Sequence, residues 1–564
     1  MEQTKLTGYP SIDRPWEKGK TYLQKHPFIP PVNIYTLIKL INRKNLDKSA
    51  ITCHENTYTY GQMLDDSVRL AHAMALNKVK RGDIVAVCLP NIYEAVIVFL
   101  ACNKVGAVFT CLNSNTSSSE ICNYINLYNS PIIFTHRKDL VAPLFEQTAI
   151  KEIVMVGTNS EELPFSDQRA VHYAAFVREG KCNWRGGIKF NVNDDALILY
   201  TSGTTGKPKS VVLTNKNISA AFIYMNNSSD WAVHHIQRML ICVPFAYPYG
   251  FVTSLLSALA AKCTAILCPY MSGKLIPYYY SQKPDMVMGS PALLDLTIRN
   301  MPEDQDLSFV RFFISGGDFL TLNMYEKGKS FFMRHRSNVF IGNGSGNAET
   351  VSIATTPFGF RNRPETAGVV LTGTDAMIVD PVTFEEKKYG EEGLMLASGK
   401  YVFREYYGEP GQTKAAKKVI HGREYFITGT MGYLDEDGYF TLTGRQSRFY
   451  INASLNKIYL DHVQKIINNL DCVEACAAVK VPDEKELYVN KAYIVLKEGY
   501  RPCDEMKQTI LQALNAPKMD EDSETLKSHE IPTYMEFLDR LPLMEGSEKV
   551  NYLALEERAA KERI

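Results

Sequence analysis

Hydrophobic runs alternate with helical patterns early in the chain. The pattern predicts a helix over residues 61–76, a buried strand over residues 84–89 and a further strand over residues 106–112. Pro90 and Asn91 are expected to cap the helix that lies between the two strands. Strand–helix–strand alternation is typical of a parallel sheet covered by helices, so we expect an α/β fold.

A loop rich in hydroxyls and glycines lies between a predicted strand at residues 196–199 and another at residues 211–213. Glycines let backbone amides turn toward an anion, and hydroxyls and lysines add further donors. The loop therefore predicts a polyphosphate site, although Pro208 and the glycine spacing differ from the common P-loop. The alternative is a surface loop with chance lysines. The candidate phosphate ligands are Thr201, Ser202, Gly203, Thr204, Thr205, Gly206 and Lys209.

Composition narrows the class of protein. The chain has 564 residues, well beyond one compact core, so we expect two or more domains. Lys plus Arg and Asp plus Glu number 62 each, which gives no global attraction for nucleic acid or an anionic membrane. The apolar stretches near residues 95–112 and 251–270 contain Lys104 and Lys262 and fit a buried helix and strand better than a membrane span. Scattered cysteines in apolar runs favour a cytoplasmic protein.

The run from Tyr200 to Asn215 closely resembles the signature of the adenylate-forming enzymes, which include acyl- and aryl-CoA synthetases. The family pattern is Y-T-S-G-T-T-G-x-P-K-G-V-x-x-T-H, and here Ser210 replaces the last Gly and Asn215 the His. The resemblance continues to the end of the chain. It implies a large N-terminal α/β domain, residues 1–446, and a small mobile α+β domain, residues 447–564.

A Gly-rich turn between predicted strands at residues 339–341 and 351–353 bears one carboxylate, Glu349. Such a turn suits the binding of a hard cation beside phosphates. The alternative interpretation is a solvent-exposed turn that binds no ligand. The turn resembles the family's Y-G-x-T-E motif, which implies Glu349 as a Mg²⁺ ligand. Ser345 stands where the family Tyr stacks on adenine. The resemblance also places Asn343, Gly344 and Ser345 around the nucleotide, with Ser345 shared by the substrate.

Two further motifs are implied to hold the nucleotide. Residues 425–440 resemble W-x-x-T-G-D-x-G-x-x-D-x-D-G-Y-x, and Thr430 occupies the place of the Asp that accepts both ribose hydroxyls. The Gly444-Arg445 pair matches a family G-R, which implies that Arg445 lies near ribose and phosphate and that Arg448 takes the hinge position.

The acid site is implied by two weaker motifs. Residues 244–250 are similar to P-x-x-H-x-x-G, with Tyr247 in the His position and Gly250 at the end. An aromatic run of this kind is often core, so core packing and site lining both remain open for Tyr247. Gly316 and Gly317 follow a predicted strand and form only a turn signal by themselves. In the family the equivalent glycines flank adenine and the acyl pocket.

The C-terminal motif implies a lysine for adenylation. Residues 541–555 resemble L-P-x-T-x-x-G-K-I-D-x-x-A-L, and Lys549 aligns with the Lys that bridges the substrate carboxylate and the α-phosphate. Near residue 455 the family carries a Gly that permits close approach of a pantetheine thiol, and this chain has Leu455.

The resemblance implies a two-step ligase that takes ATP, Mg²⁺ and a small carboxylic acid. The acyl adenylate would pass to coenzyme A or to the phosphopantetheine thiol of an acyl or peptidyl carrier protein. Lys549, Thr205 and Glu349 would carry catalysis. The alternative is a non-ligating regulatory protein that binds nucleotide or acyl groups on the same fold. Ser345, Thr430 and Leu455 favour this alternative, whereas the intact phosphate loop favours the ligase.

Overall fold

The fold comes from a computed structural model of the chain. It describes residues 6–561 except 158–168, 187–190, 202–208, 229–235, 318–319, 359–361, 446–447, 452–456, 484, 486, 516–525 and 544–549.

The first sheet has eight strands in the order β19-β9-β8-β4-β3-β5-β6-β7. Its inner strands run parallel, which confirms the parallel sheet expected from the sequence, while β8 and β9 form an antiparallel pair. The strands are β3 (Ile84–Cys88), β4 (Val108–Cys111), β5 (Ile132–Thr135), β6 (Glu152–Met155), β7 (Ala170–His172), β8 (Asp195–Tyr200), β9 (Ser210–Thr214) and β19 (Glu405–Tyr406).

The second sheet has seven strands in the order β14-β13-β12-β10-β11-β1-β2. Gly289, Ser315 and Asn343 stand in register at the carboxyl ends of β12, β13 and β14, so these three neighbouring strands end at one edge. The strands are β1 (Ser49–Cys53), β2 (Asn56–Thr59), β10 (Arg238–Ile241), β11 (Thr264–Leu267), β12 (Met286–Gly289), β13 (Phe312–Ser315) and β14 (Phe340–Asn343).

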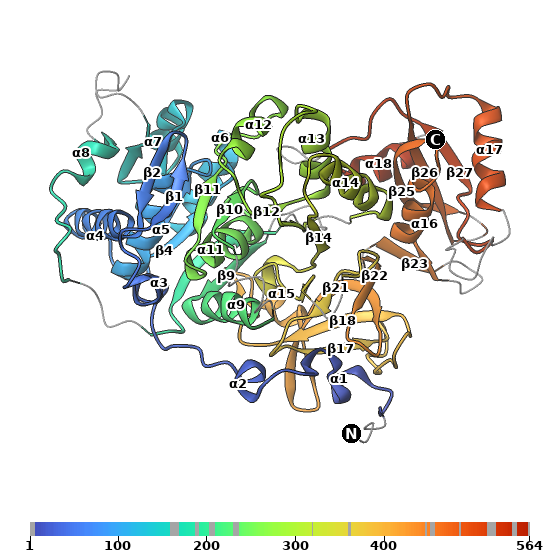
Figure 1. Ribbon diagram of the computed structural model, residues 1–564, viewed down its shortest axis with the longest axis horizontal. Helices are drawn as coiled ribbons and strands as arrows, with labels where there is room; N and C mark the ends of the chain where they lie inside the picture. Colours follow the sequence, from blue (N-terminus) through green and yellow to red (C-terminus); the bar gives the residue numbers. More distant parts are fainter. Residues whose placement is uncertain are drawn as a thin grey trace.

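Helices flank both sheets (Figure 1). The main hydrophobic cluster contains residues of both sheets and of the helices between the two sheets. Phe99 of α5, Phe109 of β4 and Phe251 of the π-helix η3 (Tyr249–Leu256) pack with ring centroids 4.9–5.5 Å apart, which joins the two layers. The helices are α3 (Ile34–Asn42), α4 (Tyr60–Leu76), α5 (Tyr93–Val105), α6 (Ser118–Tyr128), α7 (Val141–Gln147), α8 (Tyr173–Val177), α9 (Asn215–Ser228), α11 (Ser257–Ala260), α12 (Ile276–Ser281), α13 (Pro291–Asn300) and α14 (Leu322–Arg334).

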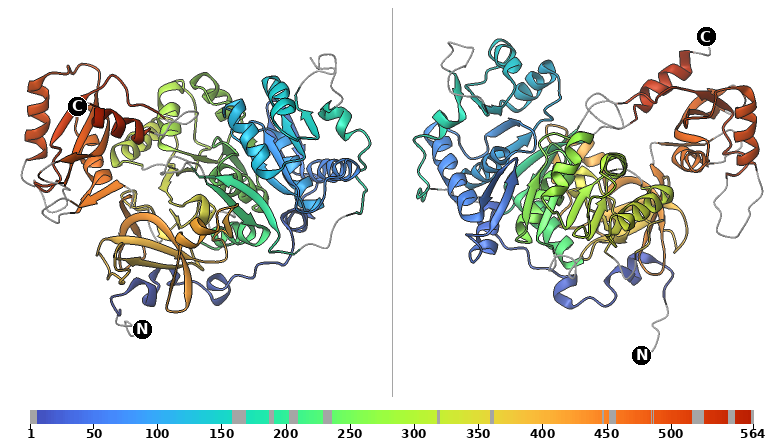
Figure 2. Two further views of the ribbon diagram at one scale, coloured as in Figure 1. Left: turned by 180° about the vertical axis from the view of Figure 1, so that it is seen from behind. Right: turned by 45° about the horizontal axis from the view of Figure 1, so that its top comes forward.

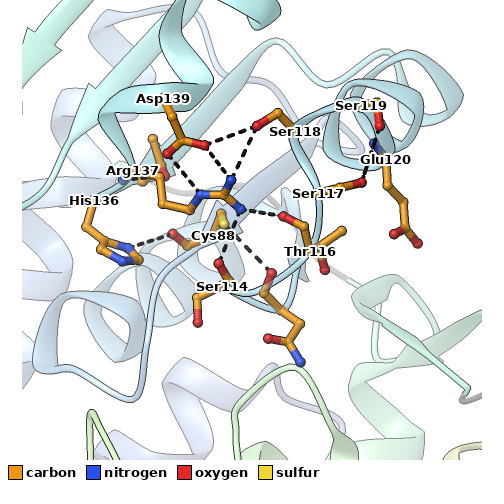
Figure 3. A network of polar contacts seen from close by, with 12 residues as sticks. Cys88, Ser114, Thr116, Ser117, Ser118, Ser119, Glu120, His136, Arg137 and Asp139 are labelled. Atoms are coloured by element: carbon orange, nitrogen blue, oxygen red, sulfur yellow. Dashed lines mark hydrogen bonds and ion pairs between the residues drawn. The ribbon is translucent and has the colours of Figure 1, made fainter. Parts of the chain in front are cut away.

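A polar network fixes the loop that leads into α6 (Figure 3). The Arg137 guanidinium donates to the backbone oxygens of Ser114 and Thr116, to Ser118 Oγ at 3.3 Å and to the Asp139 carboxylate. The Arg137 side chain thereby ties together the segments that follow β4 and β5. The start of α6, and hence the position of Tyr128 at its end, is set by this network.

Two local expectations were wrong. Asn91 does not cap α5, whose N-cap is Ile92; its side chain instead bonds Val243 O and Phe245 N, both at 2.9 Å. Residues 351–353 do not form a strand, because a 3-10 helix (Ala348–Thr350) precedes them. Val351 and Ser352 adopt left-handed backbone angles, with φ of 54° and 62°, which an extended strand does not allow.

A smaller antiparallel sheet contains β17 (Asp375–Val379), β18 (Gly393–Ser398), β20 (Lys417–Ile420), β21 (Arg423–Leu434) and β22 (Phe440–Arg445). The N-terminal segment packs against it: Trp16 is buried and its indole N–H donates to Thr374 O at 3.2 Å. Further short elements are α1 (Pro10–Asp13), α2 (Tyr22–Lys25), β15 (Thr355–Thr356), β16 (Val369–Val370) and α15 (Pro410–Ala415).

The C-terminal part forms a separate α+β unit that stands beside the rest of the chain (Figure 2, right). Its own hydrophobic core includes Val463, Ile467, Cys476 and Ile494. The boundary predicted at residues 446 and 447 lies outside the described residues and stays a prediction. The elements are β23 (Phe449–Ile451), β24 (Lys457–Tyr459), α16 (Leu460–Asn468), β25 (Val473–Asp483), β26 (Leu487–Leu496), α17 (Asp504–Leu514), β27 (Tyr534–Phe537) and α18 (Tyr552–Lys561).

In the described part of the chain, no helix combines the length and the hydropathy needed to cross a membrane.

Candidate active site

The phosphate loop is closed at its base by the β8–β9 pair. Tyr200 and Ser210 stand opposite each other, and the Thr201 amide donates to Lys209 O at 3.0 Å. The Lys209 amide in turn donates to Thr201 Oγ1 at 3.2 Å. The predicted ligands between these two residues, Ser202, Gly203, Thr204, Thr205 and Gly206, lie outside the described residues.

Ser210 and Asn215, the two residues that differ from the family signature, each form hydrogen bonds with other elements of this chain. The buried Ser210 hydroxyl accepts from Tyr128 Oη at 2.6 Å. Asn215 Oδ1 accepts from Asn103 Nδ2 at 2.7 Å and from the Ile34 amide at 3.2 Å. The two substitutions therefore fix the stem of the phosphate loop to α6 and the start of α9 to α3 and α5.

Glu349 is held by a tyrosine that the sequence did not single out. Tyr406 Oη donates to Glu349 Oε1 at 2.6 Å, and the Phe403 amide donates to Glu349 O at 2.7 Å. Burial, together with the Glu349 carboxylate, raises the pKa of the Tyr406 phenol, so the hydroxyl stays a donor at neutral pH.

The same tyrosine meets the phosphate loop. Lys209 Nζ lies 4.9 Å from the centroid of the Tyr406 ring, within cation–π distance. This contact is possible because β19, which carries Tyr406, pairs with β9 beside the loop. Tyr406 thus joins the lysine predicted for phosphate to the carboxylate predicted for Mg²⁺. A single tyrosine at a strand end carries no local signature, which is why the sequence did not reveal it.

The carboxyl edge of β13 and β14 has polar atoms without partners. Ser315 Oγ and Asn343 Oδ1 are buried and make no hydrogen bond in the described part of the chain. Buried polar atoms are rarely left in this state, so the edge suits a ligand that offers donors, such as the amino group of adenine. Gly344 and Ser345 continue from this edge, and the Ser345 amide donates to Thr355 Oγ1 at 3.0 Å.

Gly316 packs close to an aromatic ring. A Cβ on Gly316 would lie 3.1 Å from Cζ of Tyr249, and Gly317 has a φ of +83°, in the left-handed region that glycine favours. The Tyr249 hydroxyl donates to the backbone oxygens of Ile314 at 2.8 Å and Gly289 at 3.0 Å. This ring therefore forms a fixed wall under the predicted nucleotide glycines.

A cavity beside this edge is lined by Tyr249, Gly316, Gly317, Gly344 and residues deeper in the sheet. Tyr247 and Gly250 are not among its described lining residues. Gly250 instead lets the chain approach closely, because a Cβ there would lie 2.3 Å from Val243 O. Their substrate-binding roles stay predictions.

The two residues predicted for ribose are cross-strand neighbours. Thr430 of β21 stands opposite Arg445 of β22, and Thr430 is 2% exposed. Asn347 Nδ2 donates to Thr428 O at 3.0 Å, which ties this strand to the turn that carries Glu349.

The predicted hinge and lysine belong to the C-terminal unit. Arg448 forms an ion pair with Asp461 and donates to Gln464 Oε1 at 3.0 Å and to Ala478 O at 3.1 Å. These partners place Arg448 on the C-terminal side of the predicted boundary. Lys549 lies outside the described residues.

Comparisons with known proteins agree on one family. The family described as AMP-binding enzyme matches residues 39–407. The chain is 26% identical over 526 residues to the long-chain-fatty-acid–CoA ligase of Bacillus subtilis (strain 168), covering 88% of this chain and 89% of that protein. It is 23% identical over 481 residues to 4-coumarate–CoA ligase 3 of Arabidopsis thaliana, covering 83% of each.

Solved structures share the fold. The ATP-bound MatB of Rhodopseudomonas palustris has a TM-score of 0.79 and 22% identity, covering 93% of this chain and 99% of that one. The anthranilate CoA ligase AuaEII in complex with anthranoyl-AMP has a TM-score of 0.80 and 18% identity, covering 95% and 98%. The chain therefore belongs to the AMP-binding enzyme family and, within it, to the adenylate-forming, acyl-CoA synthetase-like class of acid–thiol ligases.

Proposed function

We propose that this protein activates a carboxylic acid with ATP and transfers the acyl group to the thiol of coenzyme A. In the first step a carboxylate oxygen bonds to the α-phosphorus of ATP, and the bond to the bridging oxygen breaks to release pyrophosphate. In the second step the thiol sulfur bonds to the acyl carbon and AMP leaves. The observation that carries the proposal is the Lys209–Tyr406–Glu349 contact beside the base of the phosphate loop.

Each part of ATP has candidate partners in this chain. Thr201, Lys209 and the loop between them would bind the phosphates, and Thr430 with Arg445 would face the ribose. Asn343 and Ser315 offer unpartnered polar atoms to the base. Lys549, on the C-terminal unit, would draw the acid and the α-phosphate together.

Glu349 is our candidate ligand for Mg²⁺. A carboxylate oxygen is the hard donor that this ion prefers, and Glu349 is fixed in orientation by Tyr406 and by its own backbone. When bound, the ion would neutralise charge on the phosphates. The chain's own contribution is to hold the carboxylate at the hydroxyl of one tyrosine and Lys209 at the ring of the same tyrosine.

The test is pyrophosphate release with Mg-ATP across a panel of carboxylic acids, followed by thioester formation with coenzyme A or with a phosphopantetheine-bearing carrier protein. We expect acid-dependent pyrophosphate release and a coenzyme A thioester. A thioester on the carrier protein alone would assign the acceptor differently. No acid-dependent release with any class of acid would refute the ligase.

The second candidate is a non-ligating protein that binds nucleotide or acyl groups. Ser345 and Thr430 favour it, because neither offers the aromatic face or the carboxylate of the family. A base–aromatic stack contributes about 1–3 kcal/mol, so its loss weakens nucleotide binding appreciably. This candidate predicts nucleotide binding in a calorimeter without pyrophosphate release.

We also propose a cytoplasmic location. All twelve cysteines are free thiols, and most of them are buried, which suits a reducing compartment. Cell fractionation with antibody detection tests this location.

A further inference from the structure

Two cysteine thiols meet at the carboxyl ends of neighbouring strands. Cys242 follows β10 and Cys268 follows β11, and their sulfur atoms lie 3.3 Å apart. The two parallel strands pair up to Ile241 and Leu267, and the Cys268 amide donates to Ile241 O at 3.2 Å, so the pairing continues to the cysteines. The backbone of the second sheet therefore holds the two thiols side by side.

The spacing of the two strands allows a disulfide. Neighbouring strands lie about 4.8 Å apart, and the Cα atoms of disulfide-bonded cysteines are usually about 4.4–6.8 Å apart. A disulfide bond is about 2.05 Å long, so the two sulfur atoms need to approach by only about 1.2 Å. Rotation of the two side chains with a small shift of the strand ends supplies this approach.

The two thiols differ in their access to solvent. Cys242 is partly exposed, whereas Cys268 is 4% exposed. Burial raises the pKa of the Cys268 thiol, which keeps this thiol protonated at neutral pH. An oxidant from solution therefore reaches Cys242 first, and Cys268 is the buried thiol that closes the bond.

Cys242 begins the segment that carries Tyr247 and Gly250, two residues predicted to bind the acid. The Asn91 side chain donates to Val243 O at 2.9 Å. A Cβ on Gly250 would lie 2.3 Å from Val243 O, so the segment folds back tightly on the residue next to Cys242. Because these contacts leave little room for adjustment, a shift of Cys242 toward β11 is transmitted along the segment.

We propose that Cys242 and Cys268 form a redox-sensitive pair that closes to a disulfide when a peroxide oxidises the protein and reopens with a dithiol. Closure moves the segment after Cys242 and slows activation of the acid. The inference rests on the proposed function only where it takes this segment as part of the acid site. In a reducing compartment such disulfides are usually transient, as a switch requires.

The reaction balances with hydrogen peroxide as the oxidant. The Cys242 sulfur attacks one peroxide oxygen, the O–O bond breaks, and a sulfenic acid forms with release of water. The Cys268 sulfur then bonds to the Cys242 sulfur, and the sulfenic hydroxyl leaves with the Cys268 proton as a second water. The two thiols together lose two electrons to the peroxide, and a dithiol reverses the change by thiol–disulfide exchange.

The first test detects the bond itself. Reduced full-length protein is treated with hydrogen peroxide, its remaining thiols are blocked with iodoacetamide, and the protein is digested with trypsin. Cys242 lies on the tryptic peptide 239–262, and Cys268 lies on the next one, 263–274. We expect mass spectrometry to find the two peptides linked by a disulfide, and dithiothreitol to separate them.

The second test measures the effect of closure. Amide hydrogen exchange over residues 243–250 should differ between the reduced and the oxidised protein. A misplacement of about 1 Å costs up to a hundredfold in rate, so pyrophosphate release at subsaturating acid should fall by about tenfold to a hundredfold on oxidation. Dithiothreitol should restore it.

Variants assign the bond to this pair. Cys268→Ser should prevent the link and keep pyrophosphate release after peroxide at the level of the reduced parent. Cys263→Ser is the matched control, because Cys263 lies on the same tryptic peptide as Cys268 but its thiol donates to Ile236 O at 3.1 Å. This control should keep both the link and the loss of release. Cys268→Ala serves the same purpose if the serine variant does not fold.

The outcomes separate this inference from the proposed function. Peptides that stay unlinked after peroxide, unchanged hydrogen exchange, or an equal loss of release in Cys268→Ser overturns the inference. A link that leaves pyrophosphate release unchanged also overturns it, and the proposed function then still stands. If the reduced protein releases no pyrophosphate with any acid, the proposed function fails, whereas the link and the hydrogen exchange still decide the inference.

Discussion

Tyr406 is the residue whose removal tests the site most directly. Tyr406→Phe keeps the ring beneath Lys209 but removes the hydroxyl that donates to Glu349. A hydrogen bond to a charged group contributes about 1.5–3 kcal/mol, so the carboxylate becomes less well oriented. We expect the Mg²⁺ concentration for half-maximal pyrophosphate release to rise by about tenfold or more, with little change in the KM of the acid.

Tyr407→Phe is the matched control. Tyr407 is the next residue, and its ring packs against Tyr128 with centroids 5.1 Å apart rather than against Glu349. This variant should keep the Mg²⁺ dependence of the parent. An unchanged Mg²⁺ dependence in Tyr406→Phe, measured beside it, would contradict a positioning role for Tyr406.

At the scale of elements, the contact between α6 and β9 predicts a compensating pair of substitutions. Ser210→Gly restores the family residue but leaves the buried Tyr128 hydroxyl without its partner at 2.6 Å. An unsatisfied buried group costs about 1–3 kcal/mol in the free energy of unfolding. Adding Tyr128→Phe removes that group, so the double variant should recover most of the loss. Urea unfolding of all four proteins measures the coupling, and simple additivity would argue against it.

The regular elements were predictable wherever a local pattern determines them. The apolar run at residues 84–89 and the helix at residues 61–76 match β3 and α4 closely, because burial and period are local properties. The strand expected at residues 351–353 does not form, since Val351 and Ser352 adopt positive φ angles of 54° and 62°. Prediction failed there because β-branched residues favour a strand, and the surrounding fold overrides that local preference.

Much of the candidate site depends on contacts between distant segments. Tyr406 meets Glu349 across 57 positions, and its strand β19 pairs with β9. The sequence motifs pointed to Glu349 and Lys209 because their neighbours are distinctive. Tyr406 does not stand in a distinctive run, so its contacts with Glu349 and Lys209 became evident only from the fold.

At the scale of the whole molecule, two cores predict two unfolding steps. The C-terminal unit has its own apolar cluster around Val463 and Ile494. A described ion pair to the large unit joins Arg299 to Glu474 at 3.4 Å, and both side chains are about half exposed. Such exposed pairs contribute little, so we expect calorimetry to resolve two transitions. A single transition whose calorimetric and van't Hoff enthalpies agree would contradict independent units.

Buried tyrosines predict a loss of stability in alkali. Burial raises the pKa of Tyr35, Tyr128 and Tyr224 from 10.0 to about 12. The folded state therefore holds these protons where the unfolded chain releases them, so their contribution is complete below pH 10 and is lost as the pH rises toward 12. Each group should lower the free energy of unfolding by about 1.4 kcal/mol per pH unit in that window.

Urea unfolding at a series of pH values between 10 and about 12 measures how steeply the free energy of unfolding falls with pH. Tyr128→Phe should reduce the slope by the share of one group, whereas Tyr22→Phe, at a side chain that is 75% exposed, should leave it unchanged. A stability that stays level up to the upper end of this window would show that these phenols ionise as readily inside the fold as outside it.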